Sequence, residues 1–93
     1  LAERGFLEDA ELETYTKDGS KLEINVSERL GALVEATCGS LGQGLSVAVG
    51  VAQSAKRQNR NFRSYVILGD GELQEGQVWE AAMFSAHHQL SNL

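Results

Sequence analysis

The chain has 93 residues, of which 42% are hydrophobic and 23% are charged, a composition typical of a globular domain or of part of one. Its formal net charge of −5 argues against nonspecific nucleic-acid binding, because such binding needs a basic surface. No stretch approaches the roughly 18 apolar residues of a membrane span, and no signal peptide is visible. The single cysteine excludes an internal disulfide, so we expect a reducing, cytoplasmic location.

The first forty residues carry few signals of regular structure. Residues 7–15 predict a short acidic helix, and residues 18–20, with the sequence Asp-Gly-Ser, predict a turn. Residues 21–36 show no steady hydrophobic period, so we expect an extended loop with a short turn. A glycine-rich turn follows at residues 37–44.

The remainder of the chain alternates between helical and strand-like patterns. Residues 45–57 are apolar almost all round, which predicts a buried helix. Residues 64–68 are rich in β formers and predict a buried strand of a parallel sheet. Residues 75–88 repeat apolar side chains at spacings of three and four and predict a second helix, after which Leu90 and Leu93 lead into another strand. The expected fold is therefore α/β, a partial parallel-sheet unit with a helix–strand–helix core.

A carboxylate stands between two glycines where the predicted strand ends, at Gly69, Asp70 and Gly71. Ligands of open α/β sheets bind in the crevice beyond the carboxyl ends of the strands. Glycine on each side lets the backbone turn tightly and approach a ligand closely. A lone Asp suits a hard cation such as Mg²⁺, which keeps few protein ligands and shares phosphate oxygens. We therefore predict a metal–diphosphate site here, with an ordinary surface turn as the alternative.

A second glycine-rich element, residues 39–44, opens the first long helix. Free backbone N–H groups at a helix N-terminus favour an anion, while a plain helix-start turn explains the same residues equally well. The spacing matches neither the phosphate loop nor the dinucleotide-binding turn.

These two elements carry a family resemblance. Residues 69–82, GDGELQEGQVWEAA, closely resemble the thiamine diphosphate motif of transketolases. Residues 39–50, GSLGQGLSVAVG, resemble the turn and helix that precede this motif, and the separation agrees. The resemblance covers most of the chain and is closest to the N-terminal subunit of split, two-chain transketolases. It implies that residues 1–93 are a fragment of the thiamine diphosphate-binding domain.

The resemblance also implies a cofactor site. Asp70 is expected to ligate Mg²⁺, Gly71 to meet the diphosphate of thiamine diphosphate, and Gly69 to allow the turn. The backbone of a second group of residues is expected to lie along the cofactor, near its aminopyrimidine: Gly39, Ser40 and Leu41.

The family's reaction is the transfer of a two-carbon ketol unit between sugar phosphates. Glu75 and Glu80 match acidic residues placed at the subunit interface between two active sites, and they are the candidate catalytic residues. The implied partners are sugar phosphates and the pyrimidine-binding domain or C-terminal subunit, in a homodimer or heterotetramer. The chain lacks that domain's activating carboxylate, and the Asn that completes the metal site is expected just past Leu93. The fragment alone is therefore expected to be inactive.

One position departs from the family pattern. Transketolases carry Gly-His-Pro after a Leu-Glu pair, whereas Leu22 and Glu23 are followed here by Ile24, Asn25 and Val26. Asn cannot act as an acid or base near neutral pH, so no catalytic role is carried onto Asn25. The alternatives are another thiamine diphosphate enzyme (the α chain of a 2-oxo acid dehydrogenase or deoxyxylulose phosphate synthase) and a non-catalytic remnant that keeps only the fold.

Other prominent side chains have simpler interpretations. Adjacent helical residues point about 100° apart, so His87 and His88 make a poor metal pair and are expected to pack or to face the helix dipole. Trp79 and Phe84 are expected to be core or interface anchors. A basic cluster is interpreted as a solvated helix end and loop: Lys56, Arg57, Arg60 and Arg63.

Overall fold

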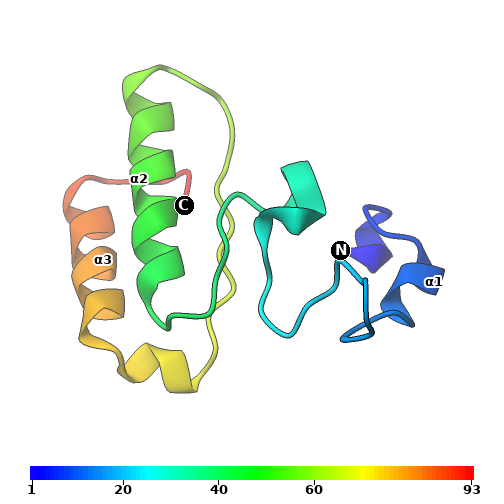
Figure 1. Cartoon of the computed structure of the whole chain (residues 1–93). Coiled ribbons are helices and arrows are strands. Elements are labelled where there is room, and N and C mark those ends of the chain that lie inside the picture. The colour runs from blue at the N-terminus through cyan, green and yellow to red at the C-terminus, as the bar shows by residue number, and fades with distance from the viewer. The chain divides into compact units, whose positions relative to one another are not determined.

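The computed structural model describes all 93 residues and divides them into two compact units, Leu1–Gly39 and Ser40–Leu93. Every regular element is an α-helix or a 3₁₀-helix, and no residue is in a strand (Figure 1). Of the α/β architecture expected from the sequence, the helices are formed and the sheet is not. None of these helices is both long and apolar enough to cross a membrane.

Turns and short helices build the first unit. It contains η1 (Ala2–Arg4), α1 (Asp9–Leu12) and η2 (Glu28–Leu33), and none of the three buries a residue. The predicted acidic helix is confirmed in its centre only. The predicted turn around Gly19 is confirmed, because the Ser20 N–H donates to the Lys17 carbonyl over 3.0 Å.

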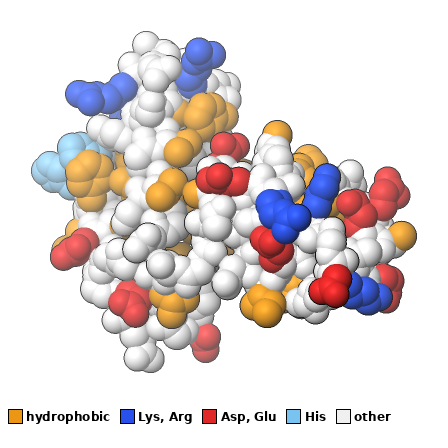
Figure 2. Space-filling model, viewed as in Figure 1, with side chains coloured by type: hydrophobic (Ala, Val, Ile, Leu, Met, Phe, Trp, Pro, Cys, Tyr) orange, Lys and Arg blue, Asp and Glu red, His pale blue; other side chains and the backbone are white.

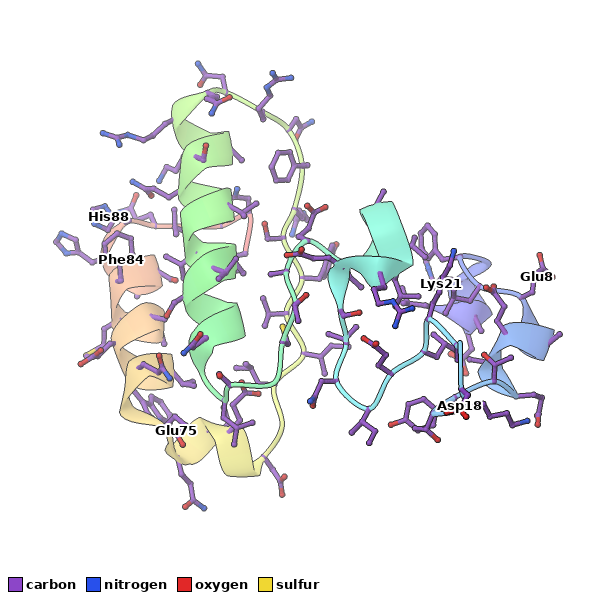
Figure 3. The ribbon with its side chains drawn as sticks, in the orientation of Figure 1. Glu8, Asp18, Lys21, Glu75, Phe84 and His88 are labelled. Atoms are coloured by element: carbon purple, nitrogen blue, oxygen red, sulfur yellow. The ribbon has the colours of Figure 1, made fainter.

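The surface of the first unit mixes charged side chains with exposed apolar ones, such as Ile24 at 78% exposed. Acidic and basic side chains are intermixed over it (Figure 2). Glu8, Asp18 and Lys21 are all exposed on it (Figure 3). A unit with this surface and no buried apolar side chain depends on local hydrogen bonds for its shape.

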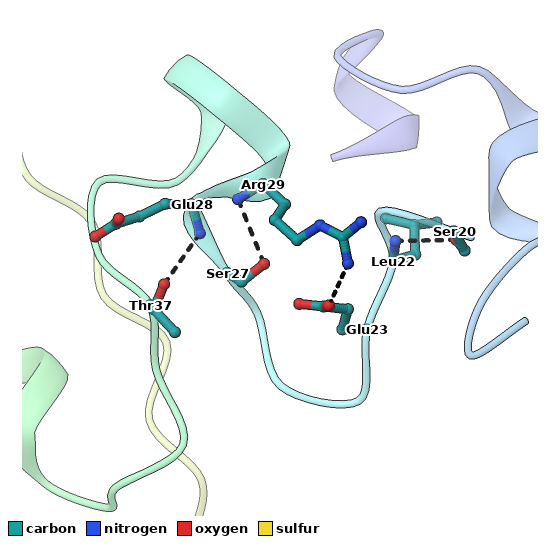
Figure 4. A network of polar contacts seen from close by, with 7 residues as sticks. All are labelled: Ser20, Leu22, Glu23, Ser27, Glu28, Arg29 and Thr37. Atoms are coloured by element: carbon teal, nitrogen blue, oxygen red, sulfur yellow. Dashed lines mark hydrogen bonds and ion pairs between the residues drawn. The ribbon is translucent and has the colours of Figure 1, made fainter. Parts of the chain in front are cut away.

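One polar network fastens the loop between residues 20 and 37 (Figure 4). The Thr37 hydroxyl accepts from the Glu28 N–H over 3.2 Å, and the Ser27 hydroxyl accepts from the Arg29 N–H over 3.4 Å. The Arg29 guanidinium forms an ion pair with Glu23 at 2.6 Å. The nearby Ser27 hydroxyl and the Arg29 guanidinium together hold the pKa of Glu23 below its usual value.

The second unit is built on two helices, α2 (Gln43–Arg57) and α3 (Gly76–His87), which confirm the two predicted helices to within two residues at each end. They lie side by side and run in the same direction (Figure 1). An extended segment returns from the end of α2 to a short helix, η3 (Gly71–Gln74), which leads into α3. This up–down–up course is the one expected of a helix–strand–helix unit.

The core of the second unit lies between α2 and α3. It consists of Val49, Ala52, Ala81 and Leu90, with Leu45 packed against it. Ala52 is completely buried, and its small side chain lets the two helices approach closely. The expected burial of α2 on most faces is wrong, because Val47 remains 46% exposed. The chain supplies only one neighbouring helix, so only one face of α2 is covered.

The predicted strand at residues 64–68 is extended, but it is neither paired nor buried. Tyr65 is 86% exposed and Ile67 is 98% exposed, whereas the alternate residues Val66 and Leu68 are half-buried. Side chains of an extended chain point to opposite faces in turn. One face is thus partly covered by the unit, and the other has nothing against it.

The missing sheet has a simple physical cause. A strand needs neighbouring strands to complete its ladder of backbone hydrogen bonds. Here the Ser64 N–H finds one acceptor, the Asn92 carbonyl at 2.8 Å. The second strand expected from Leu90 onward is also not formed: a turn follows α3, and Leu90 is buried in the core.

Candidate functional site

Asp70 stands at the junction between the extended segment and η3. Its side chain caps η3, because one carboxylate oxygen accepts the Gly71 N–H at 2.9 Å. The residue is exposed, and its other oxygen accepts no hydrogen bond from the protein. That free oxygen is a suitable ligand for a hard cation.

The two glycines beside Asp70 were expected to allow a tight turn, but their role in the structure is to leave space. Neither Gly69 nor Gly71 has a positive φ, so the turn does not require glycine for its backbone conformation. A Cβ at Gly71 would meet nothing within 4 Å. The absence of a side chain therefore leaves open space beside the Asp70 carboxylate, and the backbone is accessible to a ligand.

Glu72 is the residue that the sequence interpretation missed. One of its carboxylate oxygens accepts the Gly42 N–H at 2.7 Å, and the other accepts the Gly69 N–H at 3.1 Å. Gly42 is the N-cap of α2, and Gly69 precedes Asp70. A single side chain thus joins the two glycine-rich elements. Nothing local marks Glu72, because its partner Gly42 is 30 positions away.

Gln77, a residue of α3, holds the Ser40–Gly42 turn that precedes α2. Its amide Nε2 donates to the Leu41 carbonyl at 2.8 Å. Gly42 is buried and has φ +82°, and a Cβ there would lie 2.7 Å from the Gln77 Cγ. Glycine is required at this position for both its conformation and its contact. The Ser40–Gly42 turn is therefore fixed by two side chains of the second motif.

These contacts revise the expected anion site at the start of α2. The negative group at this helix N-terminus is the chain's own Glu72 carboxylate, which satisfies the Gly42 N–H. Of the two predicted anion sites, the Gly69–Gly71 turn is the accessible one, because nothing lies within 4 Å of a Cβ built at Gly71.

The candidate catalytic carboxylates lie on the outside of the unit. Glu75 is the exposed N-cap of α3 (Figure 3), and Glu80 lies one turn into the helix and is also exposed. Neither forms a salt bridge or a side-chain hydrogen bond within the chain. Trp79, beside Glu80, is 59% exposed, although its indole N–H donates to the Leu73 carbonyl at 2.8 Å. It is therefore not a core residue of this chain.

The remaining predicted cofactor residues differ in their surroundings. Ser40 and Leu41 are exposed at the start of the second unit. Gly39 ends the first unit with φ +153°, and a Cβ there would lie 3.3 Å from the side chain of Asn25. The second unit thus brings together the turn at Leu41, the Gly69–Gly71 turn and Asp70, while Gly39 is described with the first unit.

The histidines and Lys56 lie at the C-terminal ends of α3 and α2. The His88 ring packs against Phe84 in a tilted arrangement, with ring centroids 4.2 Å apart, which confirms a packing role. Lys56 Nζ donates to the carbonyls of His88 and Gln89 at 2.7 and 3.0 Å, where its charge complements the C-terminus of α3.

No group of three or more His, Cys, Asp or Glu side chains gathers anywhere in the structure.

Comparisons with known proteins identify the family of this chain. The family model of the transketolase thiamine diphosphate-binding domain matches residues 6–93. The chain is 44% identical over 93 residues to one of the subunits of the apulose-4-phosphate transketolase of Actinobacillus succinogenes, covering 100% of this chain and 34% of that protein. It is 40% identical to the 6-deoxy-6-sulfo-D-fructose transketolase subunit SqwG of a Clostridium species, again over 100% of this chain and 34% of that protein. It is 44% identical to the transketolase of Homo sapiens over 99% of this chain and 15% of that protein.

The chain thus spans about a third of the length of the two bacterial relatives and 15% of the human protein. The match to the family model runs from residue 6 to residue 93. It includes both glycine-rich elements, which Glu72 joins. The chain therefore belongs to the transketolase family, and its residues 6–93 match the family's thiamine diphosphate-binding domain.

Proposed function

We propose that this chain forms the diphosphate-binding part of a transketolase, which transfers a two-carbon ketol unit between sugar phosphates with Mg²⁺ and thiamine diphosphate. The observation that carries the proposal is the accessible Gly69–Gly71 turn, with a free Asp70 oxygen beside open space and a second glycine turn tied to it. Family membership supplies the cofactor class.

The chemistry of the residues fits such a group. Asp70 would hold the divalent cation through one carboxylate oxygen, and the backbone at Gly71 would lie against the diphosphate. The turn formed by Gly39, Ser40 and Leu41 would lie along the aminopyrimidine. When bound, thiamine diphosphate supplies a thiazolium carbon that acts as nucleophile and electron sink. The chain's own contribution is to orient the cofactor and to hold the cation at a fixed position.

The exposed carboxylates of α3 fit a role at an interface. Glu75 and Glu80 have no partner within the chain, and the apolar side chain of Trp79 lies exposed beside them. In the proposed enzyme these carboxylates face a neighbouring protomer and link two active sites. The pyrimidine-binding domain or C-terminal subunit supplies the rest of the site, and the complete enzyme is a homodimer or heterotetramer. Alone, these 93 residues are expected to bind cofactor weakly and not to turn over.

The metal assignment is tested with Asp70→Asn in the full-length protein in its assembled form. Isothermal titration with thiamine diphosphate in Mg²⁺ is expected to show about 10- to 100-fold weaker affinity, because a neutral amide oxygen binds the cation more weakly than a carboxylate. Asp18→Asn is the matched control, since Asp18 is an exposed aspartate in the turn of the first unit. Equal affinities for Asp70→Asn and the unmodified protein would reject Asp70 as the metal ligand.

The reaction itself is tested by ketol transfer between sugar phosphates. We expect activity that depends on both added Mg²⁺ and added thiamine diphosphate. A protein that binds the cofactor but releases no aldose phosphate from any ketose phosphate would instead be another type of thiamine diphosphate enzyme. A protein that binds no cofactor would be a remnant of the fold.

A further inference from the structure

The two oxygens of one carboxylate are each used by a different glycine turn. Glu72 accepts the Gly42 N–H with one oxygen and the Gly69 N–H with the other. A carboxylate is the side chain that can accept two such bonds, since both of its oxygens are acceptors and neither carries a proton when ionised. Hydrogen bonds from backbone N–H groups to an ionised acceptor are among the stronger ones in proteins.

The location of Gly42 makes the first of these bonds specific. Gly42 is the buried N-cap of α2, where backbone N–H groups have no intrahelical partner and the helix dipole favours negative charge. Glu72 is itself only partly exposed and lies in η3, directly after the Asp70 turn. The carboxylate therefore acts as an internal anion between the start of α2 and the turn that carries Asp70.

A second contact keeps the same turn in place without charge. Gln77 donates to the Leu41 carbonyl and Glu72 accepts from the Gly42 N–H, so both polar atoms of the Leu41–Gly42 peptide group are held by residues of the second motif. The Gln77 contact reaches the first turn only, whereas the Glu72 carboxylate bonds to both turns. Glu72 is consequently the side chain that sets their separation.

We propose that Glu72 is a positioning residue: its carboxylate fixes the Ser40–Gly42 turn at a set distance from the Gly69–Gly71 turn, so that one thiamine diphosphate can lie against both turns. This inference rests on the proposed function for its ligand. It assigns Glu72 no contact with the cofactor or the metal; its effect passes through the two glycine amides.

The test compares Glu72→Ala, Glu72→Gln and a control, Gln74→Ala, in the full-length assembled protein. Gln74 is an exposed residue of the same short helix and forms no side-chain hydrogen bond in the structure. Two measurements are made: amide hydrogen exchange at Gly42 and Gly69 without cofactor, and the dissociation constant of thiamine diphosphate in Mg²⁺. The first readout does not depend on activity.

Glu72→Ala is expected to remove the protection of both amides and to weaken cofactor binding by about 10-fold or more. Glu72→Gln keeps one acceptor oxygen, so it is expected to protect only one of the two amides and to bind with intermediate affinity. Gln74→Ala is expected to match the unmodified protein in both measurements. The intermediate result for Glu72→Gln distinguishes positioning from general loss of folding, and circular dichroism confirms that α2 and α3 are retained.

Two results would overturn the inference. Unchanged protection at Gly42 and Gly69 in Glu72→Ala would show that the carboxylate does not hold the turns. Lost protection with unchanged cofactor affinity would show that the spacing does not matter for binding. Failure of the proposed function looks different: the unmodified protein then binds no thiamine diphosphate, whatever the exchange at Gly42 and Gly69.

Discussion

The two units of this chain keep their shapes by different means. In Leu1–Gly39 the only buried residue is Ser27, a polar residue, and the fold depends on turns and a small ion-pair network. In Ser40–Leu93 every buried side chain is apolar and comes from α2, α3 or the turn after α3. Burial of apolar surface is the main favourable term in folding, whereas exposed polar contacts contribute little each. The comparison teaches that the predicted metal and diphosphate residues lie in the unit that has a core.

The largest expected effect comes from placing a charge in that core. Ala52→Asp puts a carboxylate at a completely buried position without a partner, which costs about 3–5 kcal/mol. Hydrogen exchange should show loss of protection over α2 and α3, with residues 1–39 unchanged. Ser46→Asp, on the exposed face of α2, should leave both units intact. If residues 1–39 lose protection together with the helices, the two units fold as one and the comparison fails.

A smaller effect is expected from a methyl group at Gly42. Gly42→Ala meets both a left-handed backbone, at about 1–2 kcal/mol, and the Gln77 side chain at 2.7 Å. Gly19→Ala in the first unit meets only the backbone cost, because nothing lies within 4 Å of its Cβ. Thermal unfolding should therefore show a larger loss for Gly42→Ala. Equal losses would mean that the Gln77 contact does not restrain the turn.

The Lys56 contact with the end of α3 should contribute about 1 kcal/mol, since it combines hydrogen bonds with a favourable charge at a helix C-terminus. Lys56→Met keeps the length of the side chain but removes both bonds, so the unfolding temperature of the second unit should fall. Lys17→Met, in the first unit, is the matched control, because Lys17 is exposed and its side chain forms no hydrogen bond. A fall of the same size in both variants would contradict the assigned role.

The smallest expected effect is a pH dependence confined to the first unit. The Ser27 hydroxyl and the Arg29 guanidinium lower the pKa of Glu23 from its usual 4.5, so the ionised form is favoured in the folded chain. Its small stabilising contribution is fully present above pH 4.5 and is lost as the pH falls through the lowered pKa. A carboxyl NMR titration should place the Glu23 midpoint below 4.5, and Ser27→Ala should raise it. An unchanged Glu23 midpoint in Ser27→Ala would show that the Ser27 hydroxyl does not stabilise the Glu23 carboxylate.

Local patterns predicted the parts of the fold that need only local interactions. The two long helices were predicted because their hydrophobic spacing and their backbone bonds both lie within the segment. The strand at residues 64–68 was predicted from composition, but its pairing needs neighbours that the chain does not provide. Tyr65 and Ile67 are consequently exposed instead of buried.

The candidate site divides in the same way. The residue types around Asp70 were enough to indicate a cation and a diphosphate, because the chemistry of one carboxylate between two glycines is local. The family resemblance was also contained in the sequence, and the match to residues 6–93 confirms it. The roles of Glu75 and Glu80 stay predictions.

What the sequence alone determined is therefore the family, the two helices and the chemical character of the Asp70 turn. Only the tertiary structure showed that Glu72 joins Gly42 to Gly69, that Gln77 holds Leu41, and that Lys56 caps the end of α3. The first and second of these contacts join residues 30 and 36 positions apart, and the third joins residues 32 positions apart. Which polar side chain meets which backbone group over such separations depends on how the helices pack, and the packing is fixed by burial between α2 and α3 and not by any local pattern.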